Sequence, residues 1–189
     1  MIFPKGVWSG VVGCCLLAAA SGVSGAQMQA AKPAVGTQVA PSQVFGQVLS
    51  GWEREFVSLA EAMPEDKYNF APTQGEFKGV RTFAEQVKHV AEANDHYFAD
   101  PTKPAADNSA AIEKLKTKAE IVAALKHSFA EAHAYVNAMT PENAFVMTAH
   151  GTRADTAAFA IAHMMDHYGQ MVEYLRMNGL VPPASRGSM

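Results

Sequence analysis

Two histidines near the C-terminal end of the chain have the spacing that metal-binding helices use. His163 and His167 are four residues apart, in the segment HMMDH. On an α-helix, residues at i and i+4 share one face, with their Cβ atoms about 5–6 Å apart. Two imidazoles at that separation suit one metal ion, and helical zinc motifs use the same spacing. A metal site also needs a third protein ligand, which must come from elsewhere in the chain.

His89 and His96 are the candidates for that third ligand. Both lie in a segment with a helical pattern, at about residues 82–98. They are separated by two turns, which is about 10.5 Å of rise, so they cannot both bind the ion held by the pair. The periodicity of the segment does not choose between them. His127 and His133 lie six residues apart on different faces of a later helix, and we expect both to be surface or rim residues.

Four segments have the apolar periodicity of amphipathic helices, and none alternates as a strand does. They span about residues 42–63, 82–98, 118–139 and 153–178, and a short helical piece is expected near residues 112–115. This pattern predicts an all-α four-helix bundle with long inter-helix connections. The two longer connections follow the first and second helices, and they allow a topology other than simple up-down-up-down.

The first two helices have recognisable starting signals. Ser42 is a plausible N-cap of the first helix, and Thr82 caps the second with Glu85 as its capping-box partner. The side chains expected to form the buried stripe of the first helix are Val44, Val48, Trp52, Phe56, Leu59 and Met63.

Residues 1–26 have the features of a secretory signal peptide. Lys5 precedes an apolar run from Val7 to Ala20, and small residues at 24–26 predict cleavage before Gln27. The run is shorter than the roughly 20 apolar residues of a membrane span. We therefore expect an exported protein, periplasmic or extracellular, with no membrane attachment after the signal is removed.

Both cysteines of the chain, Cys14 and Cys15, lie inside the expected signal peptide. A lipoprotein signal with Cys14 as the lipidated residue is the alternative, and the apolar run that continues past this cysteine disfavours it. Cleavage before Gln27 would leave a chain without cysteine, and therefore without disulfides or thiolate ligands.

The remaining chain divides into three parts. We expect a flexible linker at residues 27–41, one domain at residues 42–183 and a frayed tail at residues 184–189. The formal net charge of −3 gives no sign of the clustered positive face that nucleic-acid binding normally requires.

Three stretches of the sequence resemble the DinB-like family. The second helix carries Phe83-x5-His89, and the loop before it reads DKYNFAPT at residues 66–73. The closing helix has the ordered motif His163-x3-His167-Tyr168-Gly169-Gln170, followed by Tyr174-Leu175-Arg176, Gly179 and Pro182-Pro183. The resemblance extends over roughly residues 44–183.

The resemblance implies a four-helix bundle that binds a divalent metal ion through three histidines. Carried over by position, these are His89, His163 and His167, and the ion is nickel, zinc, iron or manganese. Some members of the family are transferases or isomerases that use a small thiol. This chain has Tyr168 where the family often has Arg after the last histidine. Export is a second departure, because cytosolic thiols are not at hand outside the cell.

Three imidazoles leave open coordination positions on a divalent ion, as catalytic sites do. Gln170 shares the face of His167 and is a candidate second-shell residue, as is Asn94, whereas Asp166 is on another face. Two function classes follow. One is a metal-dependent hydrolase or thiol transferase acting on a small molecule, and the other is a non-catalytic bundle whose ion is structural. A fourth protein ligand such as His96 would favour the second class. Family habit and a Met- and Ala-rich surface also suggest a homodimer.

Overall fold

The computed structural model describes residues 33–99, 108–148 and 151–187. The chain divides into two compact units, and every described helix lies in the larger one, residues 36–189. The expected signal peptide and His150 lie outside the described residues. Among the helices that are described, none combines the length and apolar character needed to cross a membrane.

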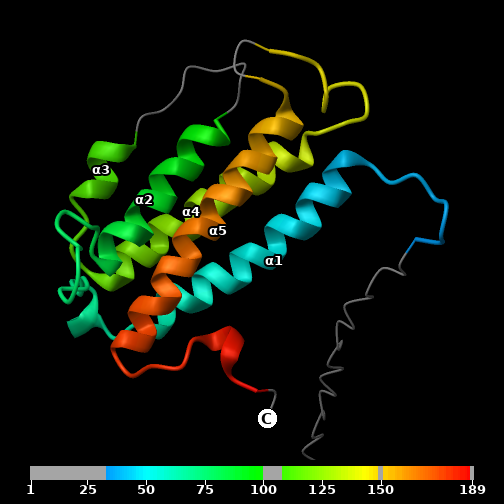
Figure 1. The fold of residues 1–189 in the computed structure, drawn as a ribbon. Helices are drawn as coiled ribbons and strands as arrows, with labels where there is room; N and C mark the ends of the chain where they lie inside the picture. The colour runs from blue at the N-terminus through cyan, green and yellow to red at the C-terminus, as the bar shows by residue number, and fades with distance from the viewer. Residues whose placement is uncertain (1–32, 100–107, 149–150, 188–189) are drawn as a thin grey trace, which may run out of the picture. The chain divides into compact units, whose positions relative to one another are not determined.

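Four long helices form the body of the larger unit (Figure 1). They are α1 (Pro41–Ala62), α2 (Phe83–Tyr97), α4 (Lys118–Asn137) and α5 (Arg153–Met177). A short helix, α3 (Ser109–Glu113), and two 3-10 turns, η1 (Glu65–Lys67) and η2 (Pro183–Ser185), complete the elements of the described chain. The described residues contain no strand, and the predicted all-α bundle is confirmed.

The helix starts follow local chemistry. The predicted capping box of α2 is present, since Glu85 Oε2 accepts hydrogen bonds from Thr82 N at 2.7 Å and Thr82 Oγ1 at 2.9 Å. The prediction of Ser42 as the N-cap of α1 is wrong, because the helix begins one residue earlier at Pro41, with Ala40 as its cap. Proline suits the first helical position, since its fixed φ is helical and an N–H there has no partner within the helix.

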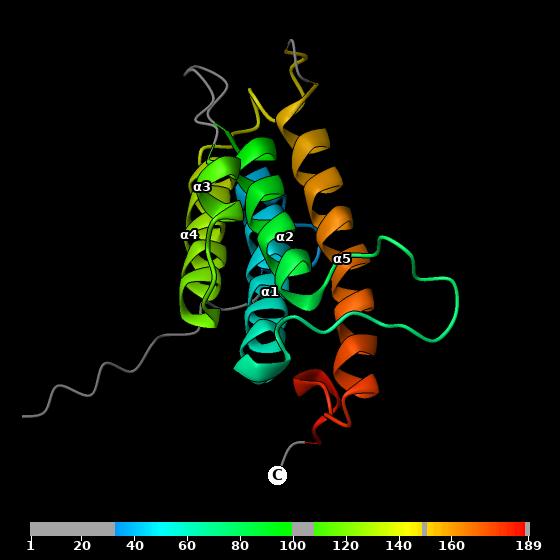
Figure 2. The ribbon, with the colours of Figure 1, turned by 90° about the vertical axis from the view of Figure 1, so that its left-hand side faces the viewer.

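The bundle places α1 and α2 at opposite corners. Each of them packs against both α4 and α5 (Figures 1 and 2). Ring and hydrogen-bond contacts pair Asn94 with Ser128 and Phe98 with Tyr135, so α2 and α4 run parallel. The topology is therefore not simple up-down-up-down, and α2 lies antiparallel beside α5.

The apolar stripes of α4 and α5 form much of the core. The stripe residues of α4 and α5 are all buried: Ile121, Leu125, Phe129, Ala132, Val136, Ala157, Ala160, Met164, Met171, Tyr174 and Leu175. In α1 the prediction is partly wrong, because Val44 and Val48 are 47% and 42% exposed. Leu49 is fully buried in their place, and Phe45 packs against the core. The bundle selects the face that carries the larger side chains.

The connection from α1 to α2 swings out beyond α5 in Figure 2, and hydrogen bonds and a ring contact fix parts of it to the bundle. Tyr68 is buried and its hydroxyl donates to the carbonyl of Ala60 at 2.7 Å. The ring of Phe70 meets Tyr174 of α5 edge-on at 5.7 Å. Backbone hydrogen bonds from Phe83 N to Phe70 O and from Ala84 N to Tyr68 O fix the start of α2. These contacts set where α2 begins relative to α5.

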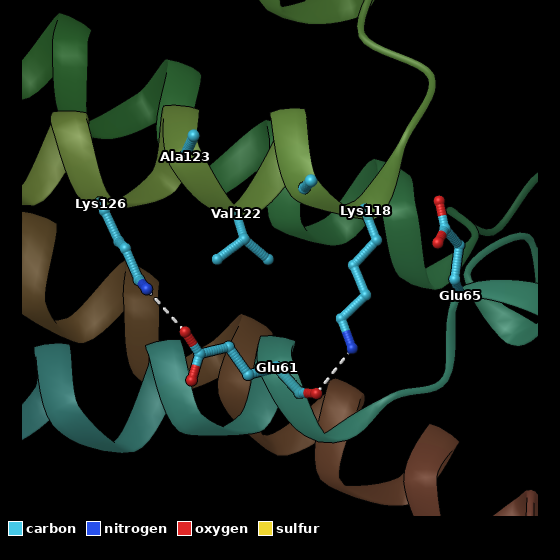
Figure 3. A pocket seen from close by; sticks show the side chains of 7 residues that line it. Glu61, Glu65, Lys118, Val122, Ala123 and Lys126 are labelled. Atoms are coloured by element: carbon cyan, nitrogen blue, oxygen red, sulfur yellow. Dashed lines mark hydrogen bonds and ion pairs between the residues drawn. The ribbon is translucent and has the colours of Figure 1, made fainter.

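Lys118, at the start of α4, caps the C-terminal end of α1 (Figure 3). Its ammonium group donates to the carbonyls of Glu61 at 2.7 Å and Met63 at 2.8 Å. Eight residues further along α4, the ammonium group of Lys126 forms an ion pair with the Glu61 carboxylate at 2.6 Å. The last carbonyls of a helix lack partners within the helix, so Lys118 supplies both hydrogen bonds and a charge that the helix dipole favours.

The two flanks of the domain differ. The described part of the expected linker is residues 33–41, and all of it lies outside any helix except Pro41, the first residue of α1. A frayed tail is predicted from residue 184. Up to Arg186 this segment makes hydrogen bonds, from Arg176 Nη2 to Ser185 Oγ at 3.1 Å and from Arg186 Nε to Val181 O at 3.0 Å.

Candidate metal centre

Three histidines from two neighbouring helices converge on one point. His89 comes from α2, and His163 and His167 come from adjacent turns of α5. Each offers one ring nitrogen, and these three atoms all lie within 4.8 Å of one another. The ring centroids are 4.5 Å apart for His163 and His167, and 4.8 Å apart for His89 and His167. The antiparallel packing of α2 on α5 brings the third ring to the pair.

The spacing of the α5 pair fits a shared ion. The Nε2 atoms of His163 and His167 are 3.1 Å apart. Two nitrogens bound to one Zn²⁺-like ion at 2.0–2.1 Å, with a bond angle between octahedral and tetrahedral, are about 2.9–3.4 Å apart. The donor set also fits, since imidazole binds zinc, nickel and iron.

A hydrogen-bond chain orients the His167 ring. His167 Nδ1–H donates to Gln86 Oε1 at 2.6 Å, and Gln86 Nε2 donates to Gln170 Oε1 at 2.9 Å. Gln170 Nε2 in turn donates to Asp166 Oδ2 at 3.1 Å. Because the amide oxygen of Gln86 can only accept, the proton of neutral His167 is on Nδ1 and the Nε2 lone pair points at the cluster. This is the arrangement that metal-ligating histidines use.

Burial keeps the cluster neutral. His167 is 5% exposed, and burial, followed by the charges of His163 and His89, lowers its pKa to about 4. Burial is also the main cause that lowers the pKa of His89 and of His163 below the ordinary value. Neutral imidazole is the form that binds metal, so all three rings are ready to bind at neutral pH.

Two aromatic rings lie in sequence beside His163. The ring of Tyr97 meets His163 edge-on at 5.6 Å and Phe159 at 5.3 Å. His163 Nδ1 is buried with no hydrogen-bond partner among the described residues. His163 is therefore held by packing, whereas His167 is held by hydrogen bonds.

On its outer side the site adjoins a pocket of about 680 Å³. His89 is the only cluster residue in the lining, which also includes Arg81, Glu85, Lys88, Glu92 and Lys116. A volume of this size suits a small molecule. A ligand in the pocket therefore lies beside His89, one member of the cluster.

The other candidate residues from the sequence lie elsewhere or act indirectly. His96 is exposed and is not part of the histidine cluster. Gln170 reaches His167 only through Gln86. Asn94 is buried, but its amide donates to Ser128 Oγ of α4 at 3.1 Å.

Two histidines and one tyrosine face other helices or solvent. His127 is exposed as expected, while His133 is half-buried and its Nε2 lies 2.8 Å from Glu53 Oε2 of α1. Tyr168, where the family often has Arg, turns towards α1: its hydroxyl donates to Glu55 Oε2 at 3.2 Å and its ring meets Trp52 at 5.5 Å.

Gln86 is the site residue that sequence reasoning missed. It is 1% exposed and is the direct partner of His167. The available signal was its position three residues before His89, on the same face of α2 and inside an otherwise apolar stripe. A polar side chain buried on that face needs a partner, and here the partner is His167.

Comparison with known proteins agrees with this architecture. The model of the DinB superfamily matches residues 49–171, a range that contains all three histidines. No curated protein matches the chain. With the bundle and the converging histidines, the match over most of the domain shows that the chain belongs to the DinB superfamily.

Proposed function

We propose that this protein is a metal-dependent enzyme, of the hydrolase or thiol-transferase type, that acts on a small molecule. His89, His163 and His167 would hold one divalent ion, nickel, zinc, iron or manganese. When bound, such an ion supplies a Lewis acid that polarises a substrate group. Other features of the chain prepare the histidines for the ion: Gln86 keeps the proton of His167 on Nδ1, and burial keeps the imidazoles neutral.

One observation favours a catalytic metal site over a structural metal site. Among the described residues the metal-binding group has three members, with no fourth His, Cys, Asp or Glu, and one of the three lines a pocket. Structural zinc sites are closed by four protein ligands, whereas catalytic sites keep a position for substrate. A three-histidine site beside a pocket therefore supports the enzyme class.

The test is whether the ion accepts an external ligand. Cobalt(II)-loaded protein should change its visible absorption when cyanide is added, because an open position lets the anion enter the coordination shell. A spectrum that stays unchanged at saturating cyanide would mean a closed site, and the ion would then be structural. His96→Ala should respond to cyanide as the parent protein does, since His96 lies outside the cluster.

We also propose that the protein is exported after removal of residues 1–26. Lys5, the apolar run and the small residues before Gln27 support this location. Sequencing of exported material should give Gln27 as the first residue. Retention of Met1, or a lipid on Cys14, would refute it.

A homodimer is the assembly that we propose. Large apolar side chains are exposed on several elements, including Phe145 at 72% and Met147 at 75%. Light scattering at micromolar concentration should give twice the chain mass, and a monomer throughout would contradict the proposal.

A further inference from the structure

The pocket beside His89 contains a cation whose position suits recognition of substrate. Arg81 lines this pocket together with His89. Its backbone is held on its C-terminal side: its carbonyl accepts from the Tyr174 hydroxyl of α5 at 3.0 Å, and Thr82, the N-cap of α2, follows it. The side chain is exposed, so a fixed backbone carries a guanidinium group that is accessible from the pocket.

The Arg81 guanidinium has no partner within the described chain. It makes no hydrogen bond or ion pair with any described residue. Glu85 also lines the pocket, and its Oε2 already accepts two hydrogen bonds from Thr82. Lys88, by contrast, is engaged, since its ammonium group donates to the Glu113 carbonyl at 2.9 Å. Arg81 is therefore a cation with free donors.

The charge balance of the pocket depends on the ion. Three basic side chains, Arg81, Lys88 and Lys116, face three acidic ones, Glu85, Glu92 and Glu113. A divalent ion on neutral imidazoles would make the balance positive, and the ion's own charge dominates such a site. The loaded pocket then favours an anion.

We propose that the substrate carries an oxyanion group, a carboxylate or a phosphate, which Arg81 binds in the pocket while the group also meets the open side of the ion. This inference rests on the proposed metal site and adds the substrate class to it. The planar guanidinium binds both oxyanions through paired hydrogen bonds. Arg81 then sets specificity and position, and the histidines hold the ion.

The experiment titrates cobalt(II)-loaded full-length protein with three probes, acetate, inorganic phosphate and neutral acetamide, and follows visible absorption. Acetate or phosphate should bind and acetamide should not, and the stronger of the two identifies the oxyanion. Arg81→Gln should weaken the binding roughly tenfold to hundredfold, the range expected when a charge-assisted hydrogen bond is lost. Arg81→Lys should recover part of the affinity.

Lys116→Gln is the matched control, because it removes the same charge from the same pocket. It should change the affinity by about twofold at most, the effect of an exposed charge that only screens. Cobalt content, measured on every variant, separates the two claims. If the parent and Arg81→Gln proteins both take up cobalt and bind the oxyanion with equal affinity, the role of Arg81 is overturned and the metal site is not. Parent protein that takes up no cobalt would overturn the metal site, and this inference with it.

Discussion

Gln86 is the side chain of α2 that forms a hydrogen bond with His167 of α5. It accepts from His167 and donates to Gln170, so both ends of its amide are used. Gln86→Leu would leave His167 Nδ1–H without its acceptor and free the ring to turn. Losing such a partner typically lowers metal affinity about 10–100-fold. We expect a drop of this size in a competition titration against a chelating indicator.

Asn94→Leu is the matched control for that variant. Asn94 is a second buried amide of the same helix, but its hydrogen bond goes to Ser128. The change should lower the stability of the fold and leave the metal affinity of the folded protein unchanged. Equal losses of affinity in the two variants would show that Gln86 has no specific role.

The histidine cluster should also make the metal-free protein sensitive to acid. In the folded chain the pKa of His167 is lowered from 6.5 to about 4 by burial and by His163 and His89. Between these values the unfolded chain binds a proton that the folded chain does not, so acid favours unfolding. The free energy of unfolding should keep its full value above pH 6.5 and decrease as the pH drops towards about 4. Urea denaturation at several pH values measures it, and a flat profile over this range would contradict the assigned burial.

The sequence predicted the members of the histidine cluster better than its surroundings. The i, i+4 spacing alone placed His163 and His167 on one face, because helix geometry is local. Choosing His89 over His96 needed the family resemblance, since periodicity left both open. Gln86 and Arg81 were missed because their roles depend on which helix lies beside α2, and no local pattern encodes that contact.

At the scale of elements, a substitution of Lys118 tests whether a side chain of α4 stabilises the C-terminal end of α1. Lys118→Met removes a charged donor from two carbonyls at the end of α1. Hydrogen bonds to charged groups contribute about 1.5–3 kcal/mol, so we expect a loss near the lower end of this range. Lys126→Met, eight residues further along α4, breaks an ion pair whose side chains are about half exposed (53% and 49%), and should cost below about 1 kcal/mol. Chemical denaturation measures both, and equal losses would refute the helix-closing role of Lys118.

The four long helices were predicted to within a few residues because each has a continuous apolar stripe. The start of α1 shows the limit of that signal. Val44 and Val48 fit the helical period, as do Phe45 and Leu49 one residue later. Periodicity accepted both faces, and the packing against α4 and α5 decided for the larger side chains.

At the scale of the molecule, topology creates the site. The chain runs α2 parallel to α4 and antiparallel to α5, and only this order sets His89 against the His163 turn. The sequence predicted that the long connections permit such a topology, but it did not choose one. The choice depends on long-range contacts such as those of Phe70 with Tyr174 and of Lys67 with the Asn178 carbonyl.

A bound ion should stabilise the whole bundle, because it joins α2 to α5 and binds only the folded chain. A ligand at 100 times its Kd adds about 2.7 kcal/mol to the free energy of unfolding. Thermal denaturation of metal-free protein with and without added zinc should therefore show a clear rise in Tm. The His167→Ala protein should show no rise, and a similar rise in both proteins would place the ion elsewhere.

The most direct test of the account is the metal content of the protein purified from its own host, followed by reloading with zinc. The account predicts about one divalent ion per chain in the parent protein and in the His96→Ala variant, which replaces an exposed histidine of α2, the helix that also carries His89. It predicts loss of stoichiometric binding in His89→Ala, His163→Ala and His167→Ala, with circular dichroism confirming that each variant is folded. Full occupancy in His89→Ala together with loss in His96→Ala would contradict the ligand set, and a parent protein that binds no divalent ion would contradict the metal centre itself.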